Sequence, residues 1–271
     1  MPASLAPLPS PLKPRSRAVS ARAVSARAVS ARAPSARTKL LDAALRVIRE
    51  QGYGATSVDE LCAAAGVTKG AFFHHFATKE ALGVAAAAHW SATTARIFEG
   101  APYHSHADPL DRILGYIAFR AWLIGGTTAQ FTCLAGTMAQ EIFRSHPAIR
   151  DACYTSISDN AAALEDALSA AIAAYGAPDG VTAHSLAMHI QCVLQGAFVI
   201  AKAKDDAGFA IESLSHLRRY FELLFGSEAS ETDPAEVAAQ NAAQNAAMRA
   251  HLESLFWTGQ PQTGQPQGEK T

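Results

Sequence analysis

Apolar residues recur at helical spacing along most of the chain, and no long window alternates with the period of two that a half-buried strand requires. The first repeat places Leu41, Ala44, Leu45 and Ile48 on one face before Gly52. Later repeats keep this spacing, so the pattern predicts an all-α protein. The predicted helices cover residues 37–51, 57–65, 68–76, 78–98, 108–124, 128–144, 147–176, 181–204 and 211–225.

The stretch TSVDELCAAAGVTKGAFFHHFATKE predicts two short helices around a glycine turn and the start of a third. Ser57 and Glu60 form a capping-box pattern, and Gly66 supplies the left-handed conformation common at helix ends. Thr68 and Thr78 are N-cap residues for the next two helices. This order predicts a helix-turn-helix, whose second helix enters the major groove of DNA.

The segment GVTKGAFFHHFATKEAL resembles the DNA-binding signature of the TetR/AcrR family of bacterial one-component repressors. The turn, small residue, aromatic pair, histidine and lysine fall at the family's spacing. Looser similarity in CLAGTMAQE, HPAIRDAC and LQGAFVIAKAK with HLRRYFELLF extends the resemblance over about residues 37–225. It implies an N-terminal helix-turn-helix DNA-binding domain followed by an α-helical ligand-binding and dimerisation domain.

The resemblance assigns these residues to the DNA face: Thr56, Ser57, Thr68, Lys69, Gly70, Phe73, His74 and Lys79. A lysine at the start of a recognition helix reaches guanine N7/O6 or a phosphate, and a glycine beside it lets the backbone approach the groove. His74 and Lys79 suit phosphates. Phe73 stands where the family usually has tyrosine, and loss of that hydroxyl predicts somewhat weaker DNA affinity. Two further aromatic residues are predicted core residues: Phe72 and Phe76.

Four segments are predicted along the chain. A disordered basic Arg/Ala/Ser-repeat arm covers 1–36, the helix-turn-helix domain covers 37–82, and the ligand-sensing and dimerisation domain covers 83–225. A C-terminal extension over 226–271 contains one helix at about 234–257 and a disordered tail with GQP repeats. In the family the last two sensor helices pair with their twofold mates as a four-helix bundle. Residues 181–204 and 211–225 match that role, which implies a homodimer.

The net charge of −1 conceals a basic N-terminus, since the first 40 residues hold eight lysines and arginines and no acidic residue. Arginine recurs there every five residues, about 500° around a helix, so the charges do not form one face. Scarce large apolar groups indicate disorder. Three interpretations remain open: an arm that neutralises DNA phosphates or enters the minor groove, an inert tail from a misplaced start codon, and an organelle transit peptide.

Aromatic residues with few polar groups predict a pocket for a hydrophobic or aromatic small molecule, although aromatics at this spacing are also common in cores. The candidate lining residues are Trp90, Tyr116, Phe119, Trp122, Phe131, Cys133 and Gln195.

Cys133 has two open interpretations. Some electrophile-sensing members of the family carry a reactive cysteine in a similar Cys-Leu helix, and a sensor thiol needs a nearby cation or helix N-terminus. The helical neighbours of Cys133 are not basic, and Lys202 or Lys204 approaches it only through folding. A small buried hydrophobe is the alternative.

The remaining cysteines, Cys62, Cys153 and Cys192, are predicted core residues with reduced thiols. His104 and His106 have no carboxylate at ligand spacing, so no metal site is predicted. No continuous apolar run reaches about 18 residues, and no signal-peptide h-region is evident. We therefore expect a cytoplasmic protein at the bacterial nucleoid, without a membrane partner or a cofactor.

The sequence thus predicts a ligand-responsive repressor that binds a palindromic double-stranded operator as a homodimer and is released by a small hydrophobic or electrophilic effector. Two alternatives remain: an activator of the same fold, and a less specific DNA-binding protein that uses its basic arm. The sequence contains no Ser-His-Asp pattern, phosphate loop or metal motif, so an enzyme is not predicted.

Overall fold

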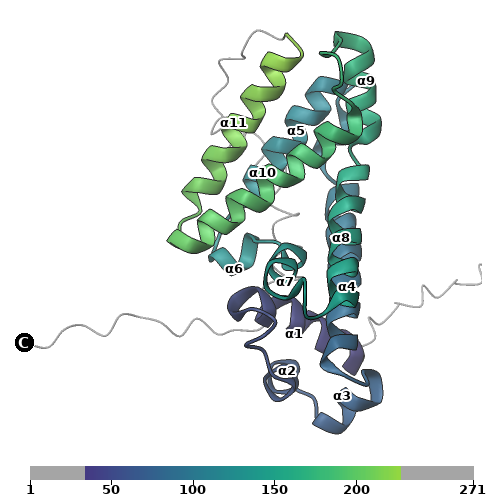
Figure 1. The fold of residues 1–271 in the computed structure, drawn as a ribbon, viewed down its shortest axis with the longest axis vertical. Helices are drawn as coiled ribbons and strands as arrows, with labels where there is room; N and C mark the ends of the chain where they lie inside the picture. Colours follow the sequence, from purple (N-terminus) through teal and green to yellow (C-terminus); the bar gives the residue numbers. More distant parts are fainter. Residues whose placement is uncertain (1–33, 227–271) are drawn as a thin grey trace, which may run out of the picture. The chain divides into compact units, whose positions relative to one another are not determined.

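The computed structural model describes residues 34–226 and contains only helices within that range (Figure 1). The all-α prediction is therefore confirmed for this part of the chain. The predicted arm before residue 34, the predicted helix at 234–257 and the GQP tail lie outside the described residues.

Four helices build the N-terminal domain: α1 (Ala36–Gln51), α2 (Val58–Ala65), α3 (Lys69–His75) and α4 (Lys79–Glu99). Each begins at a serine or threonine whose hydroxyl accepts a backbone N–H three residues on, which satisfies a donor that the first helical turn leaves free. The predicted caps Ser57, Thr68 and Thr78 are among them.

The C-terminal domain consists of η1 (Pro102–Ser105), α5 (Pro109–Trp122), α6 (Thr128–Phe131), α7 (Leu134–Ile142), α8 (Pro147–Ala162), α9 (Glu165–Tyr175), α10 (Ala183–Lys204) and α11 (Gly208–Leu224). Asp108 caps α5 with one carboxylate oxygen, which accepts the N–H groups of Leu110 and Asp111. Helices α10 and α11 lie side by side and pack on each other (Figure 1).

Two long helices predicted from the sequence are each broken in the structure. The predicted helix over 128–144 becomes α6 and α7, because Thr132 and Cys133 adopt extended backbone and Cys133 caps α7. The predicted helix over 147–176 becomes α8 and α9, although neither glycine nor proline marks the break at Ala163 and Leu164. Both helices pack on α10, but α8 also packs on α4 and α7 whereas α9 packs on α5, so the break lets the two halves pack on different neighbours.

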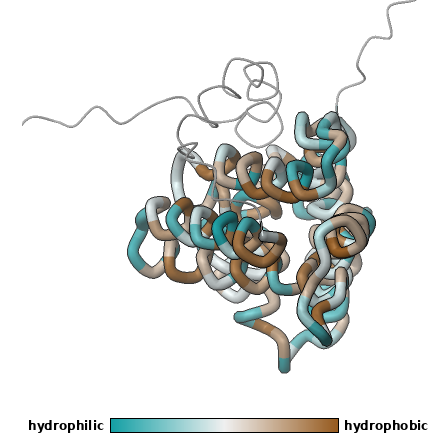
Figure 2. The backbone as a smooth tube through the Cα atoms, turned by 90° about the horizontal axis from the view of Figure 1, so that it is seen from above, coloured by the Kyte–Doolittle hydropathy of each residue, from teal (hydrophilic) through white to brown (hydrophobic). Residues whose placement is uncertain are grey.

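The apolar faces of the helices form two clusters of buried side chains. One cluster joins Leu40, Leu61 and Phe72 of the helix-turn-helix domain to Met138 of α7 and Ile149 of α8. The other lies within the C-terminal domain and is built on α5, α9, α10 and α11. In Figure 2 hydrophobic and hydrophilic positions alternate along each helix, as expected for helices with one buried face. The predicted boundary at residue 82 therefore crosses a shared core.

Helix α10 is long and apolar, which must be compared with the prediction that the protein has no membrane partner. Among the described helices it alone has the length and mean hydropathy of a membrane span, and 44% of its most apolar window is buried. Its buried face includes Leu186, Ile190 and Leu194, which belong to the C-terminal core. We therefore interpret α10 as a core helix of this domain.

Candidate DNA-binding surface and ligand pocket

The predicted helix-turn-helix is present and its turn is held by side-chain caps. Ser57 Oγ accepts the N–H of Glu60 at 3.1 Å, while the Glu60 carboxylate accepts the N–H of Ser57 at 2.7 Å. Gly66 ends α2 with φ of 62°, in the left-handed region that is unfavourable for residues with a side chain. Thr68 Oγ1 then accepts the N–H of Ala71 at 3.1 Å and starts α3.

Helix α3 has one buried and one exposed face. Phe72 and Phe76 are buried in the shared core, as predicted. Thr68, Lys69, Gly70 and His74 are exposed, and Phe73 is 52% exposed although it is a large apolar residue. The polar start of α3 is therefore available to another molecule.

Lys69 is paired with an aspartate in the free protein. Its ammonium lies 2.8 Å from a carboxylate oxygen of Asp59, and both side chains are more than half exposed. The hydrogen bond and the negative charge of Asp59 raise the pKa of Lys69, so the ammonium is charged at neutral pH. Water screens an exposed pair of this kind, so the Lys69 ammonium can exchange Asp59 for a phosphate or a base edge.

Two residues assigned to the DNA face support the turn that precedes α2 in the free protein. Thr56 is buried, and its hydroxyl donates to the carbonyl of Gly52 at 2.6 Å. The half-buried ammonium of Lys79 donates to the carbonyls of Tyr53 and Thr56 at 2.8 and 2.7 Å and lies 4.2 Å from the centre of the Tyr53 ring. Burial lowers the pKa of Lys79. The structure thus leaves six of the eight predicted residues with exposed side chains or backbone: Ser57, Thr68, Lys69, Gly70, Phe73 and His74.

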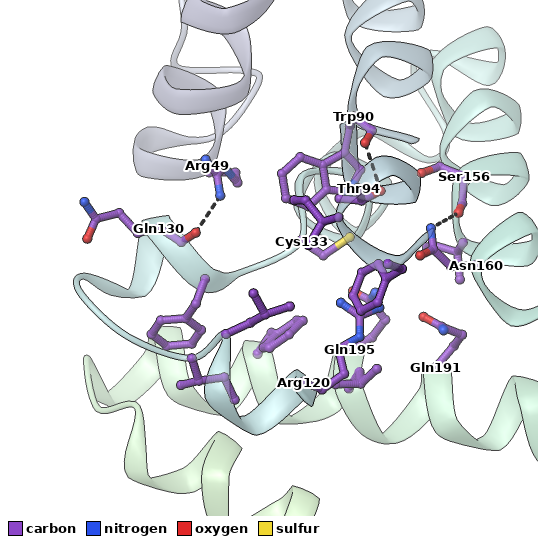
Figure 3. A pocket seen from close by; sticks show the side chains of 18 residues that line it. Arg49, Trp90, Thr94, Arg120, Gln130, Cys133, Ser156, Asn160, Gln191 and Gln195 are labelled. Atoms are coloured by element: carbon purple, nitrogen blue, oxygen red, sulfur yellow. Dashed lines mark hydrogen bonds between the residues drawn. The ribbon is translucent and has the colours of Figure 1, made fainter. Parts of the chain in front are cut away.

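A cavity of about 90 Å³ lies among α1, α4, α5, α6, α8 and α10, and Figure 3 shows the side chains that line it. Four predicted pocket residues line this cavity: Trp90, Phe131, Cys133 and Gln195. A second cavity of about 290 Å³ shares Cys133 and Gln195 with it and is bounded by Lys202 and Glu141. The lining also includes polar residues that were not predicted: Arg49, Thr94, Arg120, Asn160 and Gln191.

Three predicted pocket residues do not line either cavity. Tyr116 and Phe119 are buried in the C-terminal core, and the Trp122 ring stacks on Phe119 with 5.5 Å between centroids. Helix α5 turns these aromatic faces toward η1 and α4, where Phe98 contacts both Tyr116 and Phe119. The hydroxyl of Tyr116 accepts a hydrogen bond from Nε of Arg120, a pocket residue, at 2.8 Å.

Arg49 brings a charge from the DNA-binding domain into the pocket wall. It lies in the last turn of α1 and is 3% exposed. Its Nε donates to the carbonyl of Leu45 at 2.7 Å, and Nη1 donates to the carbonyl of Gln130 at 2.8 Å. The guanidinium lies 5.0 Å from the centre of the Trp90 ring, and burial lowers its pKa to about 10. In the sequence, the only indication that Arg49 is buried is that it directly follows Ile48 of the predicted buried stripe.

Cys133 lies at the N-terminus of α7, where Sγ accepts the N–H of Gly136 at 3.4 Å. Folding also brings Lys202 to this helix, as the sequence left open. The Lys202 ammonium donates to the hydroxyl of Thr137 at 2.8 Å and to the carbonyl of Arg49 at 3.2 Å. Burial and the positive charge of Arg49 lower the pKa of Lys202.

The other cysteines differ in exposure. Cys62 and Cys153 are buried as predicted, and burial raises the pKa of Cys153 to about 12. Cys192, predicted as a core residue, is exposed on the single chain. The correction follows from α10, which buries Gln191 and turns the next residue outward. Within residues 34–226 no group of three or more histidine, cysteine, aspartate or glutamate side chains is arranged to hold a metal ion.

Several large apolar side chains of α10 and α11 are exposed on the single chain. Ile200 is 50% exposed and Leu223 is 71% exposed, and further large apolar side chains accompany them: Val199, Phe209, Ile211 and Tyr220. Exposed large apolar side chains in this number on two adjacent helices are typical of a surface that contacts another protein.

Models of two domain families match this chain. Residues 40–86 match bacterial regulatory proteins of the tetR family, and residues 109–209 match the C-terminal domain of LmrA/YxaF-like transcriptional regulators. The first match covers the helix-turn-helix and the start of α4. The second covers α5 to α10 and the pocket residues on them.

Two curated transcriptional regulators are similar to this chain in sequence, and a solved structure is similar to it in fold. The transcriptional regulator AcuR of Cereibacter sphaeroides is 30% identical over 103 residues, which is 38% of this chain and 47% of AcuR. The HTH-type transcriptional repressor DhaR of a Mycobacterium species is 28% identical over 112 residues, 39% of this chain and 57% of DhaR. The chain thus spans about half the length of these relatives. The reduced form of Escherichia coli NemR shares the fold, with a TM-score of 0.58, 24% identity, and coverage of 72% of this chain and 100% of NemR.

The two family matches, in the order expected for the fold, agree with the exposed recognition helix and the helical C-terminal domain. Members of this family are generally ligand-responsive DNA-binding repressors and usually act as homodimers. The chain belongs to the TetR family of bacterial transcriptional regulators, and not to a family of enzymes.

Proposed function

We propose that this protein binds a palindromic operator as a homodimer and represses transcription until a small hydrophobic or electrophilic molecule enters its pocket. The observation that carries the proposal is the exposed polar start of α3, with Thr68, Lys69 and Gly70 facing solvent. In a helix-turn-helix these N-terminal positions contact base edges. Phe72 and Phe76 fix the helix from behind, so the contact surface is rigid.

The groups around the start of α3 suit the DNA backbone. Ser57 and His74 are exposed and offer hydrogen bonds to phosphates. Phe73 offers packing without a hydrogen bond. We therefore expect specificity to come chiefly from Lys69 and the adjoining backbone, with positioning from the surrounding residues.

The exposed apolar side chains of α10 and α11 support the homodimer. Two copies of this helix pair form a four-helix bundle when they meet across a twofold axis. The two copies of α3 would then address half-sites about one helical turn apart, which is why the expected operator is palindromic. We place this dimer on DNA in the bacterial cytoplasm.

Release requires the effector to bind the DNA-free conformation more tightly than the DNA-bound conformation. The pocket is suited to this because Arg49 in its wall belongs to α1, and Lys202 of α10 donates to the carbonyl of Arg49. For an electrophilic effector the reacting group would be Cys133, which lies beside Lys202 at a helix N-terminus.

The test is binding of the full chain to labelled DNA from the region flanking its own gene, at fixed salt, against a scrambled competitor. We expect saturable binding at two protomers, or a multiple of two, per site. Equal competition by the scrambled DNA would contradict the proposal and favour non-specific binding. A reporter assay with and without the protein distinguishes repression from activation.

A further inference from the structure

We infer that the pocket takes a small anion, a carboxylate with a short apolar body, whose charged end is held by Arg120 and Gln191. The inference rests on the proposed effector pocket and adds the chemical class of its ligand. It follows from three features of the described residues: the charge of the lining, the unused hydrogen-bond donors on it, and its size.

The charge of the pocket lining is entirely positive. Two arginines, Arg49 and Arg120, are among the lining residues, and the lining includes no aspartate or glutamate. Charges in a site with little water interact strongly because water screens them poorly. A cationic ligand would be repelled by both guanidinium groups, whereas an anion would be attracted by both. The lining therefore selects against cations and favours a negative charge.

Arg120 is held in place with its terminal nitrogens unused. Its Nε donates to the hydroxyl of Tyr116 at 2.8 Å, and its guanidinium lies 4.3 Å from the centre of the Phe98 ring. Within residues 34–226 its two Nη atoms have no hydrogen-bond or ion-pair partner. Two parallel N–H groups of one guanidinium match the two oxygens of a carboxylate. Tyr116 and Phe98 thus orient a carboxylate-binding fork toward the cavity.

Gln191 supplies a second unused donor. The side chain comes from α10, lines the cavity and is 3% exposed. Its Nε2 atom is buried and has no hydrogen-bond partner in the described part of the chain. Native proteins rarely leave a buried amide without a partner, because burying it without a hydrogen bond is unfavourable. Gln191 and Arg120 both appear in the lower half of Figure 3, where they face the same cavity.

The size and remaining lining of the cavity define the rest of the ligand. A volume of about 90 Å³ is smaller than the roughly 150 Å³ of an engineered cavity that binds benzene. A molecule with a few non-hydrogen atoms therefore fits without rearrangement. Ile97, Leu123 and Leu194 provide apolar contacts for its body. These features together describe a short-chain carboxylate.

Matched pairs of acids and amides test the ligand class directly. The probes are acetate, butyrate and benzoate, each compared with acetamide, butyramide and benzamide, using the full chain without DNA. Binding is measured by calorimetry and by the shift in melting temperature. We expect at least one acid to bind on the order of tenfold more tightly than its amide, the difference that one charged hydrogen-bonded group supplies. Equal binding of acids and amides, or no binding by any acid, overturns the inference.

Two variants test the assignment to Arg120. Arg120→Met should abolish the preference for the acid and leave amide binding within a few-fold of the wild type. Arg112→Met is the matched control, because Arg112 lies on the same helix but donates to the carbonyls of His106 and Ala107 and does not line the pocket. An acid preference that survives in Arg120→Met overturns the assignment. If that variant does not fold, Gln191→Leu provides the same comparison.

This test is independent of operator binding. A chain that fails to bind its operator but prefers acids would contradict the proposed function and support the ligand class. A chain that binds its operator but binds acids and amides equally would support the proposed function and contradict the ligand class.

Discussion

The side-chain carboxylate of Glu141 accepts the backbone N–H of Tyr53 at 2.6 Å. Its second oxygen accepts the N–H of Gly54 at 2.7 Å. Helix α7 begins at the pocket, where Cys133 caps it, and Glu141 lies near its end. Helix α7 therefore connects the pocket lining to the turn that precedes α2, and Glu141 makes its hydrogen bonds to that turn.

Glu141→Gln should destabilise the protein and weaken operator binding. The amide has one acceptor oxygen where the carboxylate has two, so one of the two backbone N–H groups loses its partner at a cost of about 1–3 kcal/mol. Thermal unfolding and operator titrations measure the two effects. Glu50→Gln, at an exposed position of α1, is the control and should leave both unchanged. Wild-type values for Glu141→Gln would show that this contact does not position the turn.

Lys69→Ala should lower operator affinity by about 1–3 kcal/mol, the range for one good side-chain contact to a base. The dimer should persist, because Lys69 lies on α3, far along the chain from α10 and α11. Fluorescence anisotropy and sedimentation give the two measurements. Lys39→Ala, which removes an exposed lysine of α1, is the comparison. Undiminished affinity in Lys69→Ala would refute α3 as the recognition helix.

Phe73→Tyr should raise operator affinity. Phe73 is half exposed on α3, so a hydroxyl at the ring tip is free to reach a phosphate, and one such hydrogen bond contributes about 0.5–1.5 kcal/mol. The gain should be similar on specific and scrambled DNA, because phosphate contacts carry no sequence information. Phe143→Tyr, at an exposed phenylalanine outside the helix-turn-helix, should have no effect. A loss of affinity in Phe73→Tyr would place the ring away from the DNA backbone.

Ile200→Glu should convert the dimer to a monomer and abolish operator binding while the helical content persists. Ile200 is half exposed on α10, and two copies of a charged residue would be buried across the proposed twofold axis. Light scattering after size exclusion gives the mass, and circular dichroism gives the fold. Phe143→Glu introduces the same charge at an exposed apolar residue outside α10 and α11 and should remain dimeric. A dimeric Ile200→Glu would place the interface elsewhere.

Asp108→Ala should lower stability by about 0.5–2 kcal/mol near neutral pH, since it removes the N-cap of α5. The hydroxyl of Tyr175 donates to the Asp108 carboxylate and, with the backbone N–H groups, lowers the pKa of Asp108 below its usual 3.8. The contribution is therefore complete above that value and is lost as pH falls through the lower, folded pKa. Denaturant melts at several pH values should show the two proteins converging only in acid.

The sequence-based predictions succeeded where interactions are local. Ser57, Thr68 and Thr78 cap helices through bonds to residues three positions away, so a short window contains both partners. The same logic placed Phe72 and Phe76 in the core.

The features that the sequence did not predict involve partners distant in the chain. Arg49 and Gln130 are 81 positions apart, and Lys202 and Arg49 are 153 apart, so neither pair leaves a pattern in the sequence. Thr56 and Lys79 were assigned to the DNA face, and nothing in the sequence indicated that their polar groups also donate to the carbonyls of the turn. The break before Cys133 was missed because its thiol acts as a helix cap, a role more common for serine or threonine.

The core that α7 and α8 share with the helix-turn-helix limits how this regulator can be recombined. A chimera that joins residues 34–82 to the C-terminal half of another regulator would lose Met138 and Ile149 as neighbours of Leu40 and Phe72. The transplanted head would then expose apolar surface or meet side chains of the wrong shape. Altering the operator preference by changing the exposed residues of α3 preserves that core, so point substitution is the safer route to a new specificity.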